Sequence, residues 1–198
     1  MEYVIKKAEA GANLADFPQL QIAYPYKNTP DYIKASARIA YNDEALLVHM
    51  ELEAPEVLSQ EEGTLGHPCR DSCMEFFFSP IDTDSRYLNI EFNFGGCVYF
   101  GMGDGKGLTR FTIGDPHEYL KYKSVRTEKG YYMDYEVPYS MIRRFFPGFA
   151  PYSGKKMMAN CYSCAERTQV VHYLSWSPID DKKFSFHRPE CFGTMIFE

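Results

Sequence analysis

The chain has 198 residues, of which 45% are hydrophobic and 16% aromatic, and its 21 basic and 27 acidic side chains give a formal net charge of −6. The sequence contains no basic run, which argues against nucleic acid and anionic membranes as partners. Its length suits one domain, taken here as residues 1–198, and no segment approaches the roughly 20 apolar residues that a membrane-spanning helix needs.

The N-terminal part predicts an edge strand at residues 3–7, followed by a loop rich in Pro and Tyr over residues 17–32. Charged side chains at positions 2, 6, 7 and 9 leave no room for the apolar core of a signal peptide. We therefore expect a protein that is not exported and that remains in the cytoplasm.

A β-hairpin is predicted next, with strands at residues 35–41 and 45–52 about a turn at Asn42 and Asp43. His49 alternates onto the face opposite Leu46, Val48, Met50 and Leu52. It is therefore interpreted as a surface or hydrogen-bonded histidine and not as a ligand.

The stretch over residues 69–96 predicts two more strands, at 74–78 and 87–94, joined by the turn sequence SPIDTDSR. In the second strand, alternation places one apolar row toward a core and one row of hydrogen-bonding groups on the opposite face: Asn89, Glu91 and Asn93. Contact of this row with water would account for the pattern. Glu75, however, lies within the aromatic run CMEFFF, where a carboxylate needs a partner or belongs to a site.

The second half predicts strands at 97–101, 110–113, 120–126, 130–138, 157–164, 170–177 and 192–197, with one helical turn over 138–147. The glycine-rich segment 101–107 is a weak phosphate signal, because no helix follows it as a nucleotide-binding loop requires. Many short strands with almost no helix predict an all-β, two-sheet β-sandwich of the jelly-roll or immunoglobulin-like kind.

Six cysteines are expected to be reduced thiols. Cys161 and Cys164 form a CxxC, but residues three apart in a strand point to opposite faces and no second CxxC completes a zinc tetrad. No metal site is therefore predicted there.

The order of the motifs ARIAYNDEALLVHMEL, RDSCMEFFFSP, YLNIEFNFGG, GYYMDYEVP, ANCYSC, HYLSWSP and FHRPECFG resembles the family 9 carbohydrate-binding modules, from about residue 35 to the end. The resemblance implies a β-sandwich that binds sugars without cleaving them. Characterised members attached to xylanases hold the reducing-end sugar between two tryptophans, and calcium ions support their loops. Rings suit the apolar face of a pyranose, and fixed polar groups suit its hydroxyls.

Carried over by motif, the resemblance implies that Glu75, Asn93 and Asn160 contact sugar hydroxyls. The two tryptophan positions fall at Cys69 and near Phe186, so one ring is missing and the other is smaller. Glu91 stands where the family has an arginine. Because of these differences, the sugar specificity of the family is not assigned to this chain.

The sequence therefore predicts non-catalytic binding of a saccharide in a cleft lined by Glu75, Asn93, Asn160 and Phe186. Four further residues are predicted to surround this cleft: Arg70, Glu91, His187 and Arg188. No catalytic residue, cofactor or metal is assigned, and the oligomeric state is left open. Trp176 is interpreted as a core or strand-end residue.

Three alternatives stay open. Glu75 and Glu91 would form the carboxylate pair of a glycoside hydrolase, which needs an acid and a base or nucleophile about 5 to 10 Å apart. The residue types for a haem-binding relative are present at Met50, His49, His172 and His187, although no spacing selects a pair. A degenerate interaction domain fits the same residues.

Three turn aspartates are candidates for structural calcium, although aspartate is common in turns and no EF-hand spacing is present: Asp43, Asp82 and Asp84.

Overall fold

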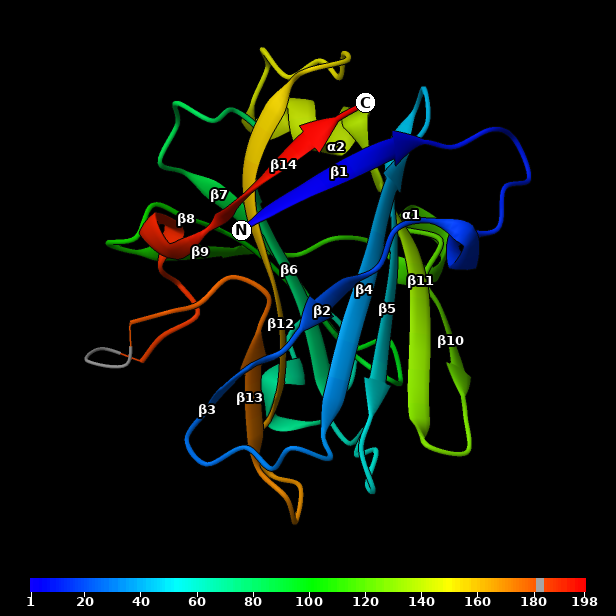
Figure 1. Ribbon diagram of the computed structural model, residues 1–198, viewed down its shortest axis with the longest axis vertical. Coiled ribbons are helices and arrows are strands. Elements are labelled where there is room, and N and C mark those ends of the chain that lie inside the picture. Colours follow the sequence, from blue (N-terminus) through cyan, green and yellow to red (C-terminus); the bar gives the residue numbers. More distant parts are fainter. Residues whose placement is uncertain (181–183) are drawn as a thin grey trace.

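The computed structural model describes residues 1–180 and 184–198 (Figure 1). Its strands are β1 (Glu2–Lys7), β2 (Leu20–Ile22), β3 (Tyr24–Tyr26), β4 (Lys34–Tyr41), β5 (Ala45–Glu53), β6 (Cys73–Ser79), β7 (Tyr87–Asn93), β8 (Val98–Gly103), β9 (Leu108–Phe111), β10 (Lys123–Arg126), β11 (Gly130–Pro138), β12 (Lys156–Ala165), β13 (His172–Ser175) and β14 (Gly193–Phe197). The helical segments are α1 (Pro116–Tyr119) and α2 (Tyr139–Phe145), with 3-10 turns η1 (Leu14–Asp16), η2 (Pro68–Arg70) and η4 (Pro189–Cys191). In the part of the chain described, no helix has the length and apolar character needed to cross a membrane.

The strands form two facing layers. One layer, called here the β5 sheet, has the order β10-β11-β5-β4, with β2 also on β4. The other, called the β6 sheet, has the order β14-β12-β6-β7-β8-β9, and β13 joins β12 to β3. Its central pairs are antiparallel, as in a β-sandwich.

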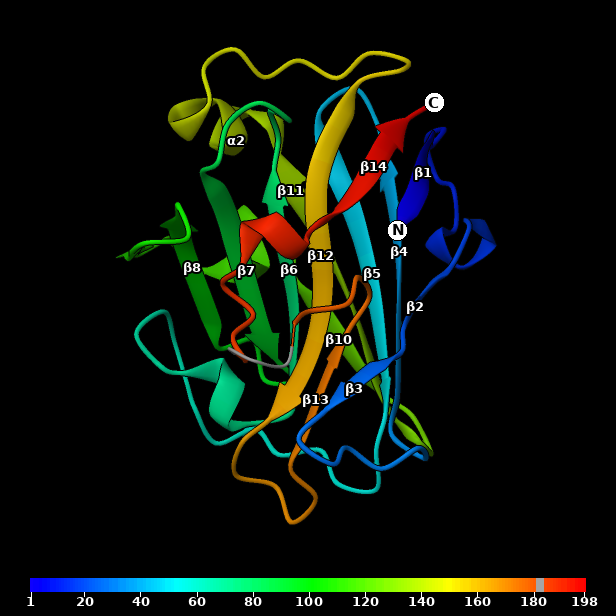
Figure 2. The same cartoon turned by 60° about the vertical axis from the view of Figure 1, so that its left-hand side comes forward.

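The predicted edge strand at the N-terminus is instead a link between the two sheets, so that prediction was wrong. Residues 2–5 of β1 pair in parallel with β14, and Lys6 and Lys7 pair in parallel with β4. β1 and β14 lie side by side in Figures 1 and 2. Parallel pairing could not be predicted, because the partners are the distant C-terminal strand and β4.

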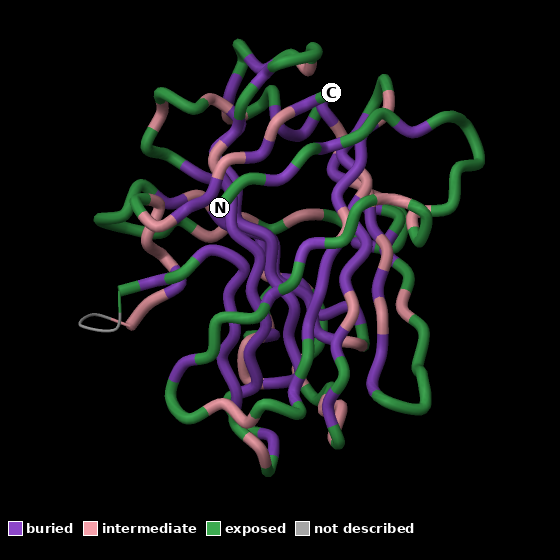
Figure 3. Tube along the Cα trace, in the orientation of Figure 1, coloured by how far each residue is buried: buried purple, intermediate pink, exposed green. Residues whose placement is uncertain are grey.

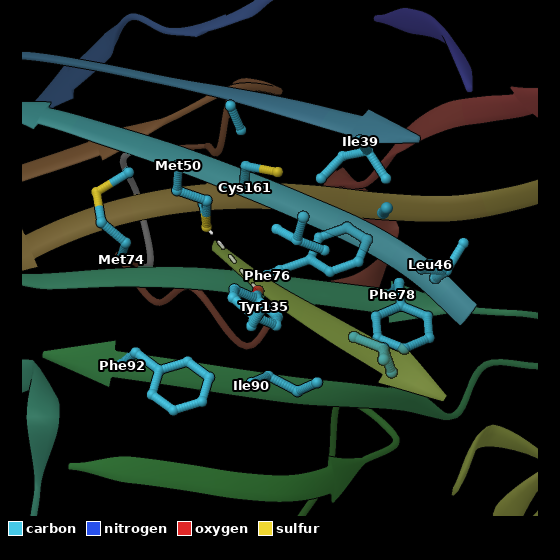
Figure 4. Close-up of a cluster of buried hydrophobic side chains, with 14 of the residues drawn as sticks. Ile39, Leu46, Met50, Met74, Phe76, Phe78, Ile90, Phe92, Tyr135 and Cys161 are labelled. Carbon is cyan, nitrogen blue, oxygen red and sulfur yellow. Dashed lines mark hydrogen bonds between the residues drawn. The ribbon is translucent and has the colours of Figure 1, made fainter. Parts of the chain in front are cut away.

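The core lies between the two sheets and follows the alternation of the sequence. β5 contributes Leu46 and Met50, and β6 contributes Phe76 and Phe78, all fully buried. Figure 4 shows side chains from the two sheets meeting in this layer, where the Tyr135 hydroxyl donates to Met50 Sδ at 3.9 Å. Burial of one face of each strand is the main stabilising term expected for such a sandwich.

Most predicted elements are confirmed, including the β4–β5 hairpin, β11 with the same bounds as predicted, and α2 directly after it. The predicted all-β sandwich is also confirmed. The loop predicted at residues 17–32 proved to contain β2 and β3, each of three residues. Pro25 lies within β3, and proline within a run argues against a strand unless its amide is not needed for pairing.

A third layer covers the outer face of the β6 sheet. The covering segment, residues 184–192, carries Phe186 and Phe192 onto Phe77, Tyr87 and Tyr162 and so forms a second apolar cluster. Figure 2 shows this part of the chain passing over the sheet, and Figure 3 shows buried backbone through the strands of both sheets. The polar row on β7 is buried, with Asn93 beneath the loop that carries Glu61 and Asp71, so contact with solvent does not explain it.

Candidate functional site

A pocket of about 340 Å³ opens on the outer face of the β6 sheet, beside the covering segment. It is lined by Lys27, His67, Cys69, Glu75, Glu91, Tyr99, Leu108, Cys164, Glu166, Tyr173, Phe184, Ser185, Phe186 and His187. The floor comes from β6, β7, β8 and β12, and one wall comes from the covering segment. Rigid strands thus hold the floor, while loops supply the rim.

Two carboxyl groups form the centre of the floor. Glu75 on β6 and Glu91 on β7 are direct cross-strand partners, so their side chains project from the same face. Glu75 Oε1 accepts a hydrogen bond from the Cys164 thiol at 3.1 Å, and Glu91 Oε1 accepts from Asn89 Nδ2 at 2.7 Å. Each group keeps further acceptor capacity for a ligand in the pocket.

Burial shifts both carboxyl groups toward their neutral form. Burial raises the pKa of Glu75 from 4.5 to about 7, although the hydrogen bond from Cys164 lowers it. Burial, and then the adjacent Glu75 carboxylate, hold the pKa of Glu91 well above its ordinary value. Because a protonated carboxyl group both donates and accepts, the pair matches hydroxyl groups, which also do both.

Aromatic side chains surround the carboxyl groups on the side of the covering segment. The Phe186 ring stacks on Tyr162 with centroids 4.2 Å apart, and it meets Phe184 and Tyr173 edge-on. Phe186 is only 8% exposed, so most of its surface contacts other residues of the protein. It therefore offers a narrow apolar patch to a ligand and not an open platform.

His187 follows on the same segment and packs on the floor. Its ring stacks on Phe77 with centroids 5.1 Å apart, and its Nδ1 shares a hydrogen bond of 3.0 Å with the Tyr87 hydroxyl. Burial lowers the pKa of His187, which favours a neutral ring. This wall of the pocket thus carries a polar ring whose neutral form is favoured.

The opposite rim is built by β8 and η2. Tyr99 on β8 is half-buried and lies under the Arg110 guanidinium, which is 4.4 Å from the ring centroid. Cys69 in η2 occupies the position where the resemblance implied a tryptophan, and it lines the pocket. Glycine at 101 leaves room on this face, because a Cβ there would lie 2.3 Å from Asn89 Oδ1.

Asn93 and Asn160 lie outside the pocket lining, and each holds a nearby loop. Asn93 Nδ2 donates to Asp71 Oδ2 and to the Glu61 carbonyl, both at 2.8 Å, which fixes the loop that carries Cys69. Asn160 Nδ2 donates to the Ser177 carbonyl at 3.0 Å and its Oδ1 accepts from the Ser177 amide. These side chains position the walls of the pocket.

The two predicted arginines also lie outside the lining. Arg70 forms an ion pair with Glu61 at 3.2 Å, on the loop before η2. Arg188 forms an ion pair with Glu190 at 2.8 Å and donates to the Asp180 carbonyl. The structure thus brings together four of the eight predicted site residues: Glu75, Glu91, Phe186 and His187.

Several pocket residues were not singled out as binding residues from the sequence, including Tyr173, Phe184, Glu166 and His67. Tyr173 lies on β13, which reaches the site only through its pairing with β12. Phe184 and Ser185 precede Phe186 in the motif FSFHRP, and their closeness in sequence was the one signal available. The others come from separate loops, and sequence does not show which loops meet.

The haem alternative gains no support from the geometry. Met50 is fully buried in the core between the sheets, whereas His49 faces outward from β5, hydrogen-bonded to Asp134 and Glu51 at 2.7 and 2.8 Å. His172 is buried against Ser163, with burial lowering its pKa to about 4. His49 is thus a hydrogen-bonded histidine, as predicted, and Trp176 is a core residue, as predicted.

Two of the three calcium candidates form ion pairs with cationic side chains. Asp84 forms an ion pair with Arg86 at 2.6 Å, and Asp43 forms one with Lys7 at 2.7 Å. Asp82 is exposed. Within residues 1–180 and 184–198, the one group of side chains with the closeness of metal ligands is Cys73, Glu75 and Cys164.

Comparison with known proteins shows that the whole sandwich is similar to carbohydrate-binding modules. The model of carbohydrate-binding family 9 matches residues 10–197. A solved putative carbohydrate-binding protein from Bacteroides uniformis is 26% identical, with a TM-score of 0.81, over 100% of this chain and 99% of its own. No curated protein matches the chain.

Two further solved structures show the same fold at low identity. Both are of a family 9 module from Caldicellulosiruptor kristjanssonii and are aligned over 100% of this chain. The complex with cellotriose has 13% identity, a TM-score of 0.70 and 94% coverage of its own chain. The complex with glucose has 14% identity, a TM-score of 0.69 and 96% coverage.

Proposed function

The chain belongs to carbohydrate-binding family 9, and from this premise we propose that it binds a saccharide, without cleaving it, in the pocket over Glu75 and Glu91. Modules of this family are generally non-catalytic. The proposal is supported most strongly by the carboxyl pair. Within the described residues neither group forms an ion pair, although both are buried among rings.

Buried polar groups that keep free acceptor capacity are costly unless a ligand uses them. A sugar ring meets this need, because its hydroxyls both donate and accept and its CH-rich face is apolar. In the pocket the hydroxyls would meet Glu75 and Glu91, and the ring face would meet Phe186 or Tyr99. This division of contacts follows from the placement of carboxyl groups on the floor and rings at the sides.

The size and charge of the pocket narrow the ligand. A volume of about 340 Å³ is near the lower end for ligand pockets, which favours one or two sugar units over a long chain. Three acidic residues line it, and the ammonium of Lys27 lies over the Tyr173 and Phe184 rings at 4.3 and 4.4 Å. Glu75 and Glu91 suit hydroxyls in their neutral form, and their ionised fraction would repel uronic acids and other anionic sugars, so the ligand is a neutral saccharide.

Isothermal titration with glucose, xylose, cellobiose and xylobiose tests the proposal. Wild-type protein should give saturable heat with a Kd between about 1 mM and 1 μM, equivalent to roughly −4 to −8 kcal/mol. Glu75→Ala and Glu91→Ala should each weaken binding about tenfold or more, because each removes a carboxyl group that contacts hydroxyls. Glu51→Ala, on the outer face of the other sheet, is the matched control and should bind like wild type.

Three results would contradict the proposal. Absence of heat with every saccharide would favour a protein-binding role for this surface over saccharide binding. Release of new reducing ends during prolonged incubation with cellobiose or xylobiose would show hydrolysis by the carboxyl pair. Equal binding by wild type and both Ala variants would show that the sugar binds at another surface.

A further inference from the structure

Two cysteines that are distant in sequence meet beneath the pocket floor. Cys73 on β6 and Cys164 on β12 are direct cross-strand partners, and their side chains project from the same outer face. Glu75 follows Cys73 by two residues and so shares that face. The two sulfur atoms and a Glu75 carboxylate oxygen all lie within 4.8 Å of one another.

This spacing suits ligands of one tetrahedral ion. Zn²⁺ binds thiolate sulfur at about 2.3 Å and carboxylate oxygen at about 2.0 to 2.2 Å, so tetrahedral donors lie roughly 3.5 to 4 Å apart. Cys164 Sγ and Glu75 Oε1 are already 3.1 Å apart. Small changes in side-chain rotamer would therefore bring the three donors around an ion, with no movement of the strands.

The donor atoms select the class of ion. Two sulfur donors favour thiophilic ions such as Zn²⁺ and Cd²⁺, whereas Ca²⁺ and Mg²⁺ require oxygen ligands. Cys161, the other member of the CxxC, is in the core between the sheets and cannot reach this point. The relevant pair is thus formed by strand pairing and not by the motif.

We propose that Cys73, Cys164 and Glu75 form a binding site for a thiophilic divalent cation, Zn²⁺ in particular, with its fourth coordination position open to the pocket. Cys164 and Glu75 line the pocket, whereas Cys73 is fully buried below them. An ion therefore enters from the pocket and keeps one side toward it. Three protein ligands and one open position are the arrangement of zinc sites that exchange water or ligands.

The surroundings predict how binding depends on pH. The hydrogen bond with Cys73 and burial raise the pKa of Cys164, and burial raises that of Cys73. Zn²⁺ binds thiolates, so it must displace these protons. The groups facing the two thiols include Glu75, Glu91, Glu166 and Cys69, and no cation among the described residues forms an ion pair with Glu75. Affinity should therefore rise with pH.

The test is calorimetric titration of the whole, chelator-treated and chemically reduced chain with Zn²⁺, in two buffers of different ionisation enthalpy. We expect one ion per chain and release of about two protons or more, because two thiols are deprotonated. Cd²⁺ should give thiolate-to-metal charge-transfer absorption of the intensity expected for two sulfur ligands. Ca²⁺ and Mg²⁺ should not compete.

Variants locate the site. Cys164→Ser and Glu75→Gln should each weaken Zn²⁺ binding by at least the roughly 10–100-fold that changes around metal ligands cause. Cys191→Ser, which changes a half-buried thiol outside the pocket lining, should leave affinity unchanged. If Cys164→Ser does not fold, the ¹¹³Cd chemical shift of the wild-type complex still counts its sulfur ligands.

Three results would overturn the proposal. They are failure of reduced wild-type protein to bind Zn²⁺, binding unchanged in both ligand variants, and a ¹¹³Cd shift typical of oxygen and nitrogen ligands alone. The proposal does not depend on saccharide binding, because each of these measurements is made without a sugar.

Discussion

The two sheets both direct acidic side chains away from the shared core, at Glu51 and Asp134 on the β5 sheet and at Glu75 and Glu91 on the β6 sheet. On the β5 sheet these carboxylates meet cationic partners near water. Glu51 contacts His49 at 2.8 Å and Arg38 at 3.4 Å, and its side chain is 40% exposed. On the β6 sheet the carboxyl groups are no more than 6% exposed and have no such partner among the described residues.

The difference comes from what lies over each face and not from the strands. Both faces follow the same alternation of polar and apolar residues. The covering segment closes the outer face of the β6 sheet, so its carboxyl groups have raised pKa values, whereas the pKa of Glu51 is lowered. An acidic row on a strand thus faces solvent where no chain segment packs over it. Where a segment does pack over it, the same kind of row is buried and can form a binding site.

Removing the ring that anchors the covering segment should have the largest effect. Phe186→Ala should lower the free energy of unfolding by about 3 to 5 kcal/mol, as truncation of a buried Phe usually does. Tyr132→Ala, whose half-buried ring lies over His49 on the β5 sheet, should cost no more than about 1 kcal/mol. Urea denaturation measures both, and equal losses would show that the covering segment contributes little.

The pH dependence of stability should have opposite signs on the two faces. The folded protein keeps a proton on Glu75 up to about pH 7, whereas the unfolded chain releases it near pH 4.5. The free energy of unfolding should therefore fall as pH rises across this window, by about 3 kcal/mol for a pKa difference of this size. Glu75→Gln should remove its share of this decline, and the share that the raised pKa of Glu91 causes should disappear in the Glu75→Gln/Glu91→Gln double variant.

Glu51→Gln is the control on the other face. Burial opposes ionisation of Glu51, but the hydrogen bond from His49 and the charges of His49 and Arg38 lower its pKa. Its contribution is present above the ordinary pKa of 4.5 and is lost as pH falls through the lower folded value. Urea denaturation from pH 3 to 8 should thus show the loss of the Glu51 contribution below pH 4.5, together with a smaller change above pH 6.5, because Glu51 also raises the pKa of His49. A decline from pH 4.5 to 7 that is as steep in Glu75→Gln as in the wild type would show that this carboxyl group does not contribute to it.

The fold was largely predictable because alternation and turn residues are local. β11, β5 and α2 follow directly from runs of residues bounded by Gly130, Pro138 and the turn at Asn42. The link made by β1 was not predictable, since it depends on which strands are neighbours in space. The same limit hid the pairing of Cys73 with Cys164.

The candidate site was predictable only in part, for a related reason. Glu75 could be singled out because a carboxyl group among aromatic residues is costly, and Phe186 was placed by the resemblance to family 9 modules. Asn93 and Asn160 have the same polar character, but their side chains form hydrogen bonds to neighbouring loops. Residue type and alternation do not distinguish these two uses of a buried asparagine.

The smallest expected effects are in the titration of single histidines, which compare the two faces directly. Burial opposes the charged form of His49, but hydrogen bonds to Asp134 and Glu51 raise its pKa above 6.5, whereas burial alone lowers that of His187. The His49 contribution to stability is therefore present below pH 6.5 and lost as pH rises through the folded pKa. NMR of the ring protons should show this order, and Asp134→Asn should lower the pKa of His49 without changing that of His187. Titration of His49 below His187 would mean that its carboxylate partners do not outweigh burial, and the contrast between the two faces would then rest on the carboxyl groups alone.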